Sequence, residues 1–541
     1  MNNALYNDQN ILSEEIKRRC TFAIISHPDA GKTTITEKML YLSKTIRSFG
    51  KIKPKKNTAY TQSDWMEIEK KRGISVTTSV IRFLYRDRLI NLLDTPGHAD
   101  FSEDTYRILT AVDCCLMVID AAKGIEERTR KLIQVAKIQK IPIITFINKI
   151  DRNYKDLNIL LNEIELELNM LSSPINYPIE YNNNLLGLYN VIDKKILLYS
   201  NNSKKKDICN NDLFNNLNIK DFSSKNNFSN MTYLKIKNFV NVIKNNFITF
   251  KRSDFLTCNI TPILFGSALD NFGINFILDF LVKYAPFPQS RLSNVRKVYP
   301  DENKFSGFVF KIQANMNLKH RDRIAFLRIV SGKYFKGIKI FQVRTQKKII
   351  VTNAVSFLAN NRILLDVAYP GDIIGIYNHG TVKIGDTFTA GENLNFVGIP
   401  SFSSEIFKSV HLINPMHQKR LLKGLFQISE EGAIQVFTPL VNNNLIIGAI
   451  GPLQFDVVLE RLKLEYKLEL FYKEVNIFTT RWISSKNINS LNTFILHNKH
   501  LIGLDREKSL VYFAPNMINL KVIISKNKDI FFSKIKEYQS Y

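Results

Sequence analysis

Residues 26–34, SHPDAGKTT, lie between a short apolar run and a stretch of helical length, and they decide the fold. In the pattern G-x-x-x-x-G-K-[ST], a loop between a strand and a helix turns main-chain N–H groups toward phosphate oxygens. Gly31, Lys32 and Thr33 fit this pattern, whereas Ser26 stands where the first glycine is usual. That glycine serves backbone geometry and contributes no contact atom, so the segment predicts a phosphate-binding loop. An ordinary strand-to-helix turn is the alternative.

The residue types in this loop predict how a triphosphate would be held. Gly31 lets the backbone approach the phosphates, and Lys32 can reach the β- and γ-phosphate oxygens. The hydroxyl of Thr33 is the kind of ligand that completes a Mg²⁺ shell. The predicted nucleotide-binding residues are Ser26, His27, Pro28, Asp29, Ala30, Gly31, Lys32, Thr33 and Thr34.

A second predicted site element is the stretch NLLDTPGH at residues 91–98. Its apolar part indicates a strand, and Asp94 at the strand end can hold the metal ion through a water molecule, while the Gly97 N–H can meet the γ-phosphate. An aspartate that caps a turn after a buried strand is the alternative, but it makes the spacing a coincidence. The predicted site residues of this element are Asp94, Thr95, Pro96, Gly97 and His98.

The stretch FINKID at residues 146–151 predicts which base is bound. The Asp151 carboxylate can accept hydrogen bonds from N1–H and N2–H₂ of guanine, whereas adenine offers no such pair of donors. Two charged hydrogen bonds at about 1.5–3 kcal/mol each favour guanine by roughly 10²- to 10⁴-fold. Lys149 can lay its aliphatic stem over the base, and Asn148 can tie this loop to the phosphate loop. The predicted ligand is therefore GTP or GDP.

The turn GSAL at residues 266–269 follows the last apolar run of this region. We expect the Ala268 N–H to bond guanine O6, with Ser267 and Leu269 beside it. Many turns of small residues look the same, so this assignment depends on the guanine-binding stretch that precedes it.

The stretch SDWMEIEKKRGISVTTS at residues 63–79 is expected to contain a switch. A hydroxyl here can close over Mg²⁺ and the γ-phosphate, ordering the segment only while triphosphate is bound. Ser75 is the first choice and Thr77 the second, with Gly73 and Ile74 beside them. A solvated charged helix followed by a strand describes much of the same segment. The predicted Mg²⁺ ligands are Thr33, Ser75 and, through water, Asp94.

Short runs rich in isoleucine, valine or phenylalanine alternate with amphipathic stretches such as residues 125–140. This alternation predicts a mainly parallel sheet covered by helices. Because the phosphate, metal and base motifs occur in order at the ends of such runs, together they predict a GTPase. The runs lie at residues 21–26, 89–94, 115–120, 142–147 and 261–266.

The pattern of apolar runs, glycines and amphipathic stretches along the chain predicts an α/β P-loop GTPase domain at residues 1–290, a β-barrel at 291–395 and an α+β domain at 396–541. Residues from about 173 to 250 are polar, rich in asparagine and weakly periodic, which predicts an insertion with long loops. Short strands punctuated by glycine predict the barrel. In the third region we expect helices at about residues 416–431 and 452–466, strands at 433–440 and 445–450, and then further strands.

Lysine and arginine number 75 against 49 aspartate and glutamate residues, for a formal net charge of +26. Such an excess favours polyanionic partners, because neutralised phosphates release counterions. A proteome biased toward lysine, asparagine and isoleucine explains the excess equally well. No apolar run approaches the roughly 20 residues that span a bilayer, so we expect a soluble, cytosolic protein without a membrane partner. The cysteines, expected to be small core residues in a reducing compartment, are Cys20, Cys114, Cys115, Cys209 and Cys258.

The short motifs HPDAGKTT, RGISVTTS, DTPGH and NKID resemble those of the translational GTPases. Longer stretches, such as SDWMEIEKKRGIS, FSEDTYRILTAVDCCLMVIDAAKGIEERTRKL and LLKGLFQISEEGAIQVF, are similar to the bacterial peptide chain release factor 3 family, a relative of elongation factor G. The similarity extends from about residue 20 to the C-terminus and is least in the asparagine-rich insertion and the final part of the chain. It implies the same succession of a GTPase domain, a β-barrel and an α+β domain.

The resemblance implies that His98 orients the attacking water or stabilises charge at the γ-phosphate. His98 would move into place on contact with large-subunit ribosomal RNA, past an apolar gate of Pro28 and Ile74, and Asp29 would help to position a second cation or water. The implied protein is a monomer whose partners are the bacterial ribosome, including its large-subunit RNA and stalk proteins, and class-I peptide release factors. Its GTP form would make the class-I factor leave after peptide release, and hydrolysis would then free the protein.

Two other functions stay open from the residues. Another elongation factor G-like GTPase, active in translocation or ribosome protection, carries the same short motifs. A non-catalytic ribosome-bound scaffold is expected to have lost Lys32, Asp94 or His98, and all three are present.

Overall fold

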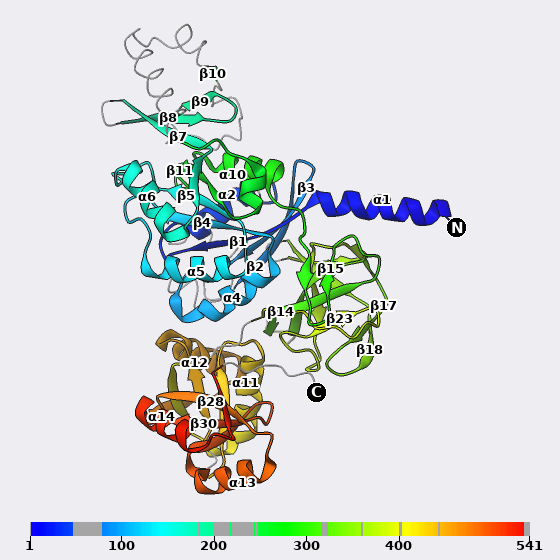
Figure 1. Ribbon diagram of the computed structural model, residues 1–541, viewed down its shortest axis with the longest axis vertical. Coiled ribbons are helices and arrows are strands. Elements are labelled where there is room, and N and C mark those ends of the chain that lie inside the picture. Colours follow the sequence, from blue (N-terminus) through cyan, green and yellow to red (C-terminus); the bar gives the residue numbers. More distant parts are fainter. Residues whose placement is uncertain are drawn as a thin grey trace.

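The computed structural model describes residues 2–46, 78–181, 184–198, 217–218, 243, 247–314, 323–358, 361–399, 403–441 and 444–534. Figure 1 shows three folded parts: a GTPase-type domain coloured blue to green, a β domain in green to yellow, and a C-terminal domain in yellow to red. The predicted switch residues Gly73, Ile74, Ser75 and Thr77, and also Cys209, lie outside the described residues. No helix in the described ranges is long and apolar enough to cross a membrane.

The first domain consists of strands β1 Arg19–Ser26, β2 Ser79–Tyr85, β3 Arg88–Asp94, β4 Cys114–Asp120, β5 Ile143–Asn148, β6 Leu171–Pro174 and β11 Ile260–Gly266, and of helices α1 Asn2–Arg18, α2 Lys32–Leu42, α4 Ser102–Ala111, α5 Glu127–Ile138, α6 Leu157–Leu168, α9 Arg252–Leu256 and α10 Ile274–Tyr284. The strands form one sheet in the order β2-β3-β1-β4-β5-β11-β6. All neighbours in it are parallel except β2 and β3, which confirms the predicted mainly parallel sheet.

Alternate side chains of β1 point to opposite faces of this sheet. Phe22 and Ile24 pack with α2 and α10, whereas Ala23 and Ile25 pack with α4, α5 and α6. Helices therefore cover both faces, and the carboxyl ends of the parallel strands meet at one edge. Ligands of such sheets bind at that edge.

The prediction of long loops is wrong for the first part of the insertion. Its described residues form the antiparallel strands β7 Asn176–Tyr181, β8 Asn184–Asn190, β9 Lys195–Leu198 and β10 Leu217–Asn218. Leu188 and Tyr189 are fully buried in the core of the first domain. A few buried apolar side chains are enough to fix these strands. The asparagines around them obscure the alternation of apolar and polar residues that would have predicted strands. Strand β6, which was not predicted, extends the main sheet beside β11.

The second domain confirms the barrel-like prediction. Its strands are β12 Arg291–Leu292, β13 Lys297–Val298, β14 Ser306–Ala314, β15 Arg323–Ser331, β16 Tyr334–Phe335, β17 Ile338–Gln342, β18 Lys347–Val351, β19 Ala354–Leu358, β20 Asn361–Leu365, β21 Val367–Ala368, β22 Ile373–Tyr377 and β23 Thr387–Thr389. One sheet takes up eight of them, in the order β18-β17-β23-β14-β15-β22-β19-β20. Val309, Leu327 and Ile374 lie in its apolar interior.

The C-terminal domain is an α+β domain, as predicted. Its elements are β24 Ile406–Leu412, α11 Gln418–Glu430, β25 Gln435–Pro439, β26 Ile446–Ala449, α12 Pro452–Tyr466, β27 Leu470–Glu474, β28 Thr479–Ser484, α13 Ile488–His497, β29 Ile502–Asp505, β30 Leu510–Ala514, α14 Met517–Lys526 and β31 Phe531–Ser533. Helix α12 has the predicted bounds. Helices α13 and α14 were not predicted, because β-branched residues and asparagine dilute their helical pattern.

Buried polar contacts join the first domain to the second. Arg328 Nη2 donates a 2.6 Å hydrogen bond to Asp113 Oδ2, and Arg19 Nε donates one of 2.8 Å to Asp372 Oδ2. The Thr21 hydroxyl donates to the Gly371 carbonyl at 2.6 Å. These fully desolvated partners fix the second domain against the sheet of the first.

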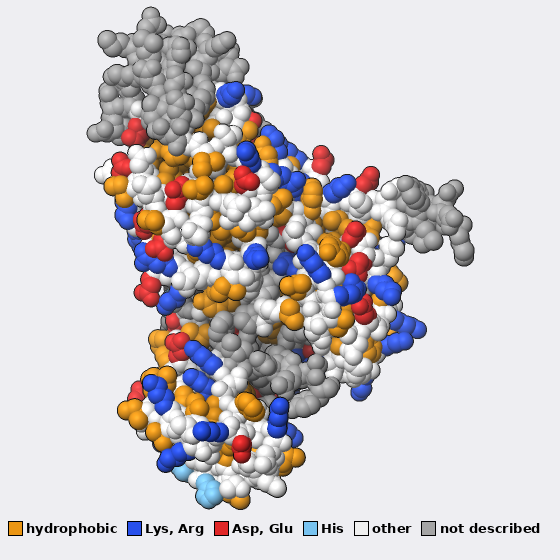
Figure 2. Space-filling model, viewed as in Figure 1, with side chains coloured by type: hydrophobic (Ala, Val, Ile, Leu, Met, Phe, Trp, Pro, Cys, Tyr) orange, Lys and Arg blue, Asp and Glu red, His pale blue; other side chains and the backbone are white. Residues whose placement is uncertain are grey.

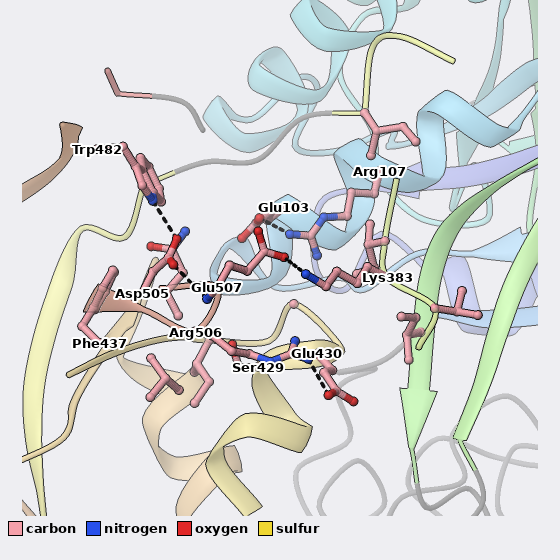
Figure 3. Close-up of a pocket in the computed structure, with 18 residues that line it drawn as sticks. Glu103, Arg107, Lys383, Ser429, Glu430, Phe437, Trp482, Asp505, Arg506 and Glu507 are labelled. Carbon is pink, nitrogen blue, oxygen red and sulfur yellow. Dashed lines mark hydrogen bonds and ion pairs between the residues drawn. The ribbon is translucent and has the colours of Figure 1, made fainter. Parts of the chain in front are cut away.

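All three domains line a cavity, drawn in Figure 3. Arg107 of α4, Lys383 of the second domain and Arg506 of the third lie around it. Lys383 Nζ donates a 2.6 Å hydrogen bond to Glu507 Oε1 across this junction. The C-terminal domain is thus attached to its neighbours partly through polar contacts.

Candidate nucleotide-binding site

The predicted phosphate loop lies between β1 and α2, with Gly31 as the N-cap of α2. Gly31 has a φ of 97°, and a Cβ there would overlap Asn148 Nδ2. Asp29 also has a positive φ, 64°, which aspartate tolerates better than most residues. Ser26 is the last residue of β1 and does not have a positive φ. Serine can therefore replace the usual first glycine.

Lys32 and Asp94 meet at the phosphate end of the site. Lys32 Nζ donates to Asp94 Oδ1 at 2.5 Å, and both side chains are buried. The next residue, Thr95, anchors the same turn through a 2.6 Å hydrogen bond from its hydroxyl to the Ile24 carbonyl. The structure thus brings together the phosphate loop and the DTPGH stretch, as the motifs predicted.

Asn148 connects the two ends of the site. Its Nδ2 donates to the Ala30 carbonyl at 2.8 Å, and its Oδ1 accepts from the Ala268 N–H at 2.9 Å. The expected link from this asparagine to the phosphate loop is present. Because the Ala268 N–H donates to Asn148, a bond to guanine O6 would have to share that N–H or replace the existing bond.

Lys149 is held through its terminal ammonium group. Its φ is 71°, and its Nζ donates to the Asp29 carbonyl and to Asp120 Oδ2, each at 2.7 Å. Burial opposes ionisation of Asp120, yet the hydrogen bonds from Lys149 and the Ala122 N–H hold its pKa below the ordinary value. Asp120 was missed by the sequence reasoning. The sequence did contain an indication of it, because Asp120 is the last residue of the apolar run at residues 115–120, where a predicted strand ends.

Asp151 lines the cleft and has one side-chain oxygen without a described partner. Its side chain is 11% exposed, and Arg152 Nε lies 3.6 Å from Oδ2. The other oxygen, Oδ1, is buried and has no hydrogen-bond partner among the described residues. Buried carboxylate oxygens normally have donors, so this atom fits a ligand that supplies N–H groups, as guanine does.

These residues surround an open cleft. Its lining consists of Ser26, His27, Pro28, Asp29, Gly31, Lys32, Thr33, Thr34, Gly97, Asn148, Lys149, Asp151, Arg152, Ala268 and Leu269. Only Arg152 among these was not predicted. Predicted residues in the described ranges that do not line the cleft are Ala30, Asp94, Thr95, Pro96, His98 and Ser267.

His98 lies beside the cleft and its ring faces Asp100. His98 Nδ1 is 3.2 Å from Asp100 Oδ1, and the ring is 37% exposed. A Cβ on Gly97 would lie 3.9 Å from Pro28 Cα, so the chain just before His98 nearly touches the phosphate loop.

The residues present fit a magnesium ion bound together with nucleotide phosphates. Thr33 lines the cleft, and Asp94 contacts Lys32 at its phosphate end. Within the described part of the chain, no group of three or more His, Cys, Asp or Glu side chains could hold a metal. Mg²⁺ usually takes one or two protein oxygens plus phosphates and water, which requires no such group.

Three family models match successive parts of the chain. The Elongation factor Tu GTP binding domain matches residues 17–287, Elongation factor G domain 2 matches residues 304–391, and the Class II release factor RF3, C-terminal domain matches residues 396–524. A crystal structure of a protein from Thermus thermophilus has the same fold with a TM-score of 0.69 at 19% identity, covering 87% of this chain and 71% of that one.

Curated relatives extend the similarity over nearly the whole chain. The "Peptide chain release factor 3" of Buchnera aphidicola subsp. Schizaphis graminum (strain Sg) is 56% identical over 97% of this chain and 98% of its own length. The protein of the same name from the Baizongia pistaciae strain is 52% identical over 96% of this chain and 98% of its own length. The chain therefore belongs to the peptide chain release factor 3 family, a family of translation-termination GTPases.

Proposed function

We propose that this chain hydrolyses GTP under stimulation by the bacterial ribosome and thereby makes class-I peptide release factors dissociate after peptide release. In this proposal the GTP form changes the conformation of the ribosome so that the class-I factor leaves. Hydrolysis to GDP and phosphate then frees the protein. We place this cycle in the cytoplasm and assign it to a monomer.

The observation that carries the proposal is the double bridge made by Asn148. Through Ala30 on one side and Ala268 on the other, it joins the loop at residues 26–34 and the turn at residues 266–269 around a single cleft. Asp151, whose Oδ1 is buried without a described partner, and Lys32 both line that cleft. Such an arrangement suits one guanine nucleotide better than separate phosphate and base ligands.

The chemistry would follow from positions along this cleft. Lys32 would move to the β- and γ-phosphate oxygens, and Mg²⁺, held by Thr33, by Asp94 through water and by Ser75 or Thr77, would neutralise charge there. His98 would orient the attacking water or stabilise charge at the γ-phosphate. Pro28 would form part of the gate that His98 passes, together with Ile74, and Asp29 would help to place a second cation or water.

The distribution of charge supports an RNA-rich partner. Figure 2 shows lysine and arginine side chains over all three domains on the face in view, interspersed with fewer acidic ones. With a formal net charge of +26, the chain favours a polyanionic surface such as large-subunit ribosomal RNA. We also expect contact with the ribosomal stalk proteins. Affinity for ribosomes should accordingly fall steeply as salt rises.

The direct test combines GTP hydrolysis, with and without ribosomes, and dissociation of a labelled class-I release factor from terminated complexes. The wild-type chain should hydrolyse GTP much faster with ribosomes and release the labelled factor. His98→Ala should bind GTP normally yet lose the stimulated turnover. His379→Ala, at an exposed position of the second domain, is the matched control and should behave as wild type.

Two results would contradict the proposal. Full ribosome-stimulated turnover in His98→Ala would exclude the assigned role of that histidine. Stimulated hydrolysis that promotes messenger translocation, with no effect on the labelled release factor, would favour another elongation factor G-like activity.

A further inference from the structure

Asp100 lies between His98 and the C-terminal domain. Its Oδ1 is 3.2 Å from His98 Nδ1, and its Oδ2 accepts a 2.7 Å hydrogen bond from the main-chain N–H of Leu453, 353 positions along the chain. Asp100 is 7% exposed. One buried carboxylate thus contacts the histidine with one oxygen and the first turn of α12 with the other.

Among the described residues of its own domain, no side chain caps the Leu453 N–H of helix α12. Its N-cap residue is Gly451, and the Gln454 side chain accepts from the N–H groups of Ile450 and Gly451 at 2.7 and 3.2 Å. The remaining donor, Leu453 N–H, is taken by Asp100. A carboxylate is stabilised at a helix N-terminus by the unsatisfied N–H groups and by the helix dipole. Asp100 therefore caps α12 from another domain.

Gly451 leaves the space that this contact needs. A Cβ at Gly451 would overlap the carboxylate of Asp100. The φ of Gly451 is −141°, which any residue adopts, so the backbone itself does not require glycine. Close approach of the Asp100 carboxylate is what favours glycine at this position.

We propose that Asp100 is a positioning residue that couples docking of the C-terminal domain to the placement of His98. While α12 holds Oδ2, Oδ1 stays against His98 Nδ1. When the C-terminal domain moves away, the carboxylate loses one anchor and the ring loses a fixed partner. This inference rests on the role proposed for His98, and it adds the route by which a distant domain acts on that residue.

One other contact that docks the C-terminal domain does not involve Asp100. The ion pair between Lys383 and Glu507, at 2.6 Å, joins the second and third domains at the cavity in Figure 3. Removing that pair weakens docking in general. Changing Gly451 acts on the Asp100 contact itself, so the two changes separate positioning from attachment.

The test uses the full chain and measures ribosome-stimulated GTP hydrolysis as kcat and as half-saturating ribosome concentration, with GTP affinity measured separately. Gly451→Ala and Asp100→Asn should each lower kcat by about 10-fold or more, since a group displaced by about 1 Å can cost that much. GTP affinity and half-saturating ribosome concentration should stay near wild type. The double variant should be no slower than Asp100→Asn, because both changes break one contact. Lys383→Gln should keep the wild-type kcat.

Wild-type kcat in both Gly451→Ala and Asp100→Asn, with stimulation lost in His98→Ala, would overturn this inference and leave the proposed function standing. A fall in Lys383→Gln equal to that in Gly451→Ala would also overturn it, because attachment of the domain would then be the cause. Full stimulation in His98→Ala would remove the role assigned to His98, whereas a wild-type chain that ribosomes do not stimulate would remove the proposed function itself. Should Gly451→Ala fail to fold by circular dichroism, Asp100→Asn, which preserves side-chain size, decides the question.

Discussion

Lys32 and Asp94 form a buried ion pair, with Lys32 Nζ 2.5 Å from Asp94 Oδ1. In the proposed function the same two groups would serve the β- and γ-phosphates and the water shell of the metal. A nucleotide must therefore separate or share this pair. The exchange would link occupancy of the phosphate end to the position of the residues that follow Asp94, His98 among them.

Replacing Lys32 by methionine should affect both stability and binding. Breaking a buried pair leaves the remaining charge poorly compensated, so Lys32→Met should lower the free energy of unfolding by about 3 kcal/mol in nucleotide-free protein. It should also abolish GTP binding. Urea denaturation and a titration with a fluorescent GTP analogue measure the two effects.

Lys131→Met is the control for that variant. Lys131 Nζ lies 3.1 Å from Glu127 Oε1, but both side chains are largely exposed. Its loss should change stability by less than about 0.5 kcal/mol. An equal loss of unfolding free energy in the two variants would show that the buried Lys32–Asp94 pair stabilises the fold no more than an exposed pair does.

The base preference should move from guanine to xanthine in Asp151→Asn. In the proposed function the carboxylate would accept from two guanine N–H groups, whereas an asparagine side chain could donate to the O2 of xanthine. Competition between GTP and xanthosine triphosphate in a binding titration measures the change. Asp87→Asn, at an exposed position of the β2–β3 turn, should leave the preference unaltered. An undiminished preference for GTP in Asp151→Asn would refute the role of Asp151 as the guanine reader.

Acid should weaken the contact between the first and second domains through Asp372. Burial opposes its ionisation, but the charges of Arg19 and Arg82 hold its pKa below the ordinary value. A carboxylate with a depressed folded pKa adds stability above its unfolded pKa, near 3.9, and this stability is lost as pH falls through the lower folded value. Asp372→Asn should therefore be less stable than wild type at neutral pH.

The pH dependence gives the measurement. Thermal denaturation from about pH 7 down to about pH 3 should show a smaller loss of stability in Asp372→Asn than in wild type, since its amide does not titrate. Asp301→Asn, at an exposed position, should follow the wild-type curve. Parallel curves for all three proteins would show that Asp372 does not contribute to acid sensitivity.

The sequence was most informative where a local signal and the packing agree. Helix α12 has the predicted bounds because Gly451 and Pro452 mark its start and apolar residues repeat along it. The P-loop, DTPGH and NKID stretches lie together because each follows a parallel strand whose carboxyl end lies at one edge of the sheet. These relationships are local in sequence or follow from the topology of a parallel sheet.

Long-range contacts explain what could not be predicted. Strands β7 and β8 are fixed by Leu188 and Tyr189, which enter the core of the first domain, while the polar residues around them suggested loops. The partner of Asp100 is a main-chain N–H in another domain, and the spacing of residues in the sequence does not predict this contact. Asp120 is an intermediate case, since its place at a strand end was visible but its bond to Lys149 was not.

Asn148 and Asn176 offer a matched comparison for the last prediction. Each is buried and makes two hydrogen bonds to the main chain: Asn148 to Ala30 and Ala268, and Asn176 to both the N–H and the carbonyl of Phe265. Alanine at either position leaves main-chain groups unsatisfied and should lower the free energy of unfolding by about 1–3 kcal/mol. Only Asn148 lies in the cleft, so only Asn148→Ala should also weaken GTP and GDP binding, by about 10- to 100-fold. Nucleotide titrations and urea denaturation of the two variants check this, and equal nucleotide affinities would mean that the double bridge stabilises the fold without shaping the site.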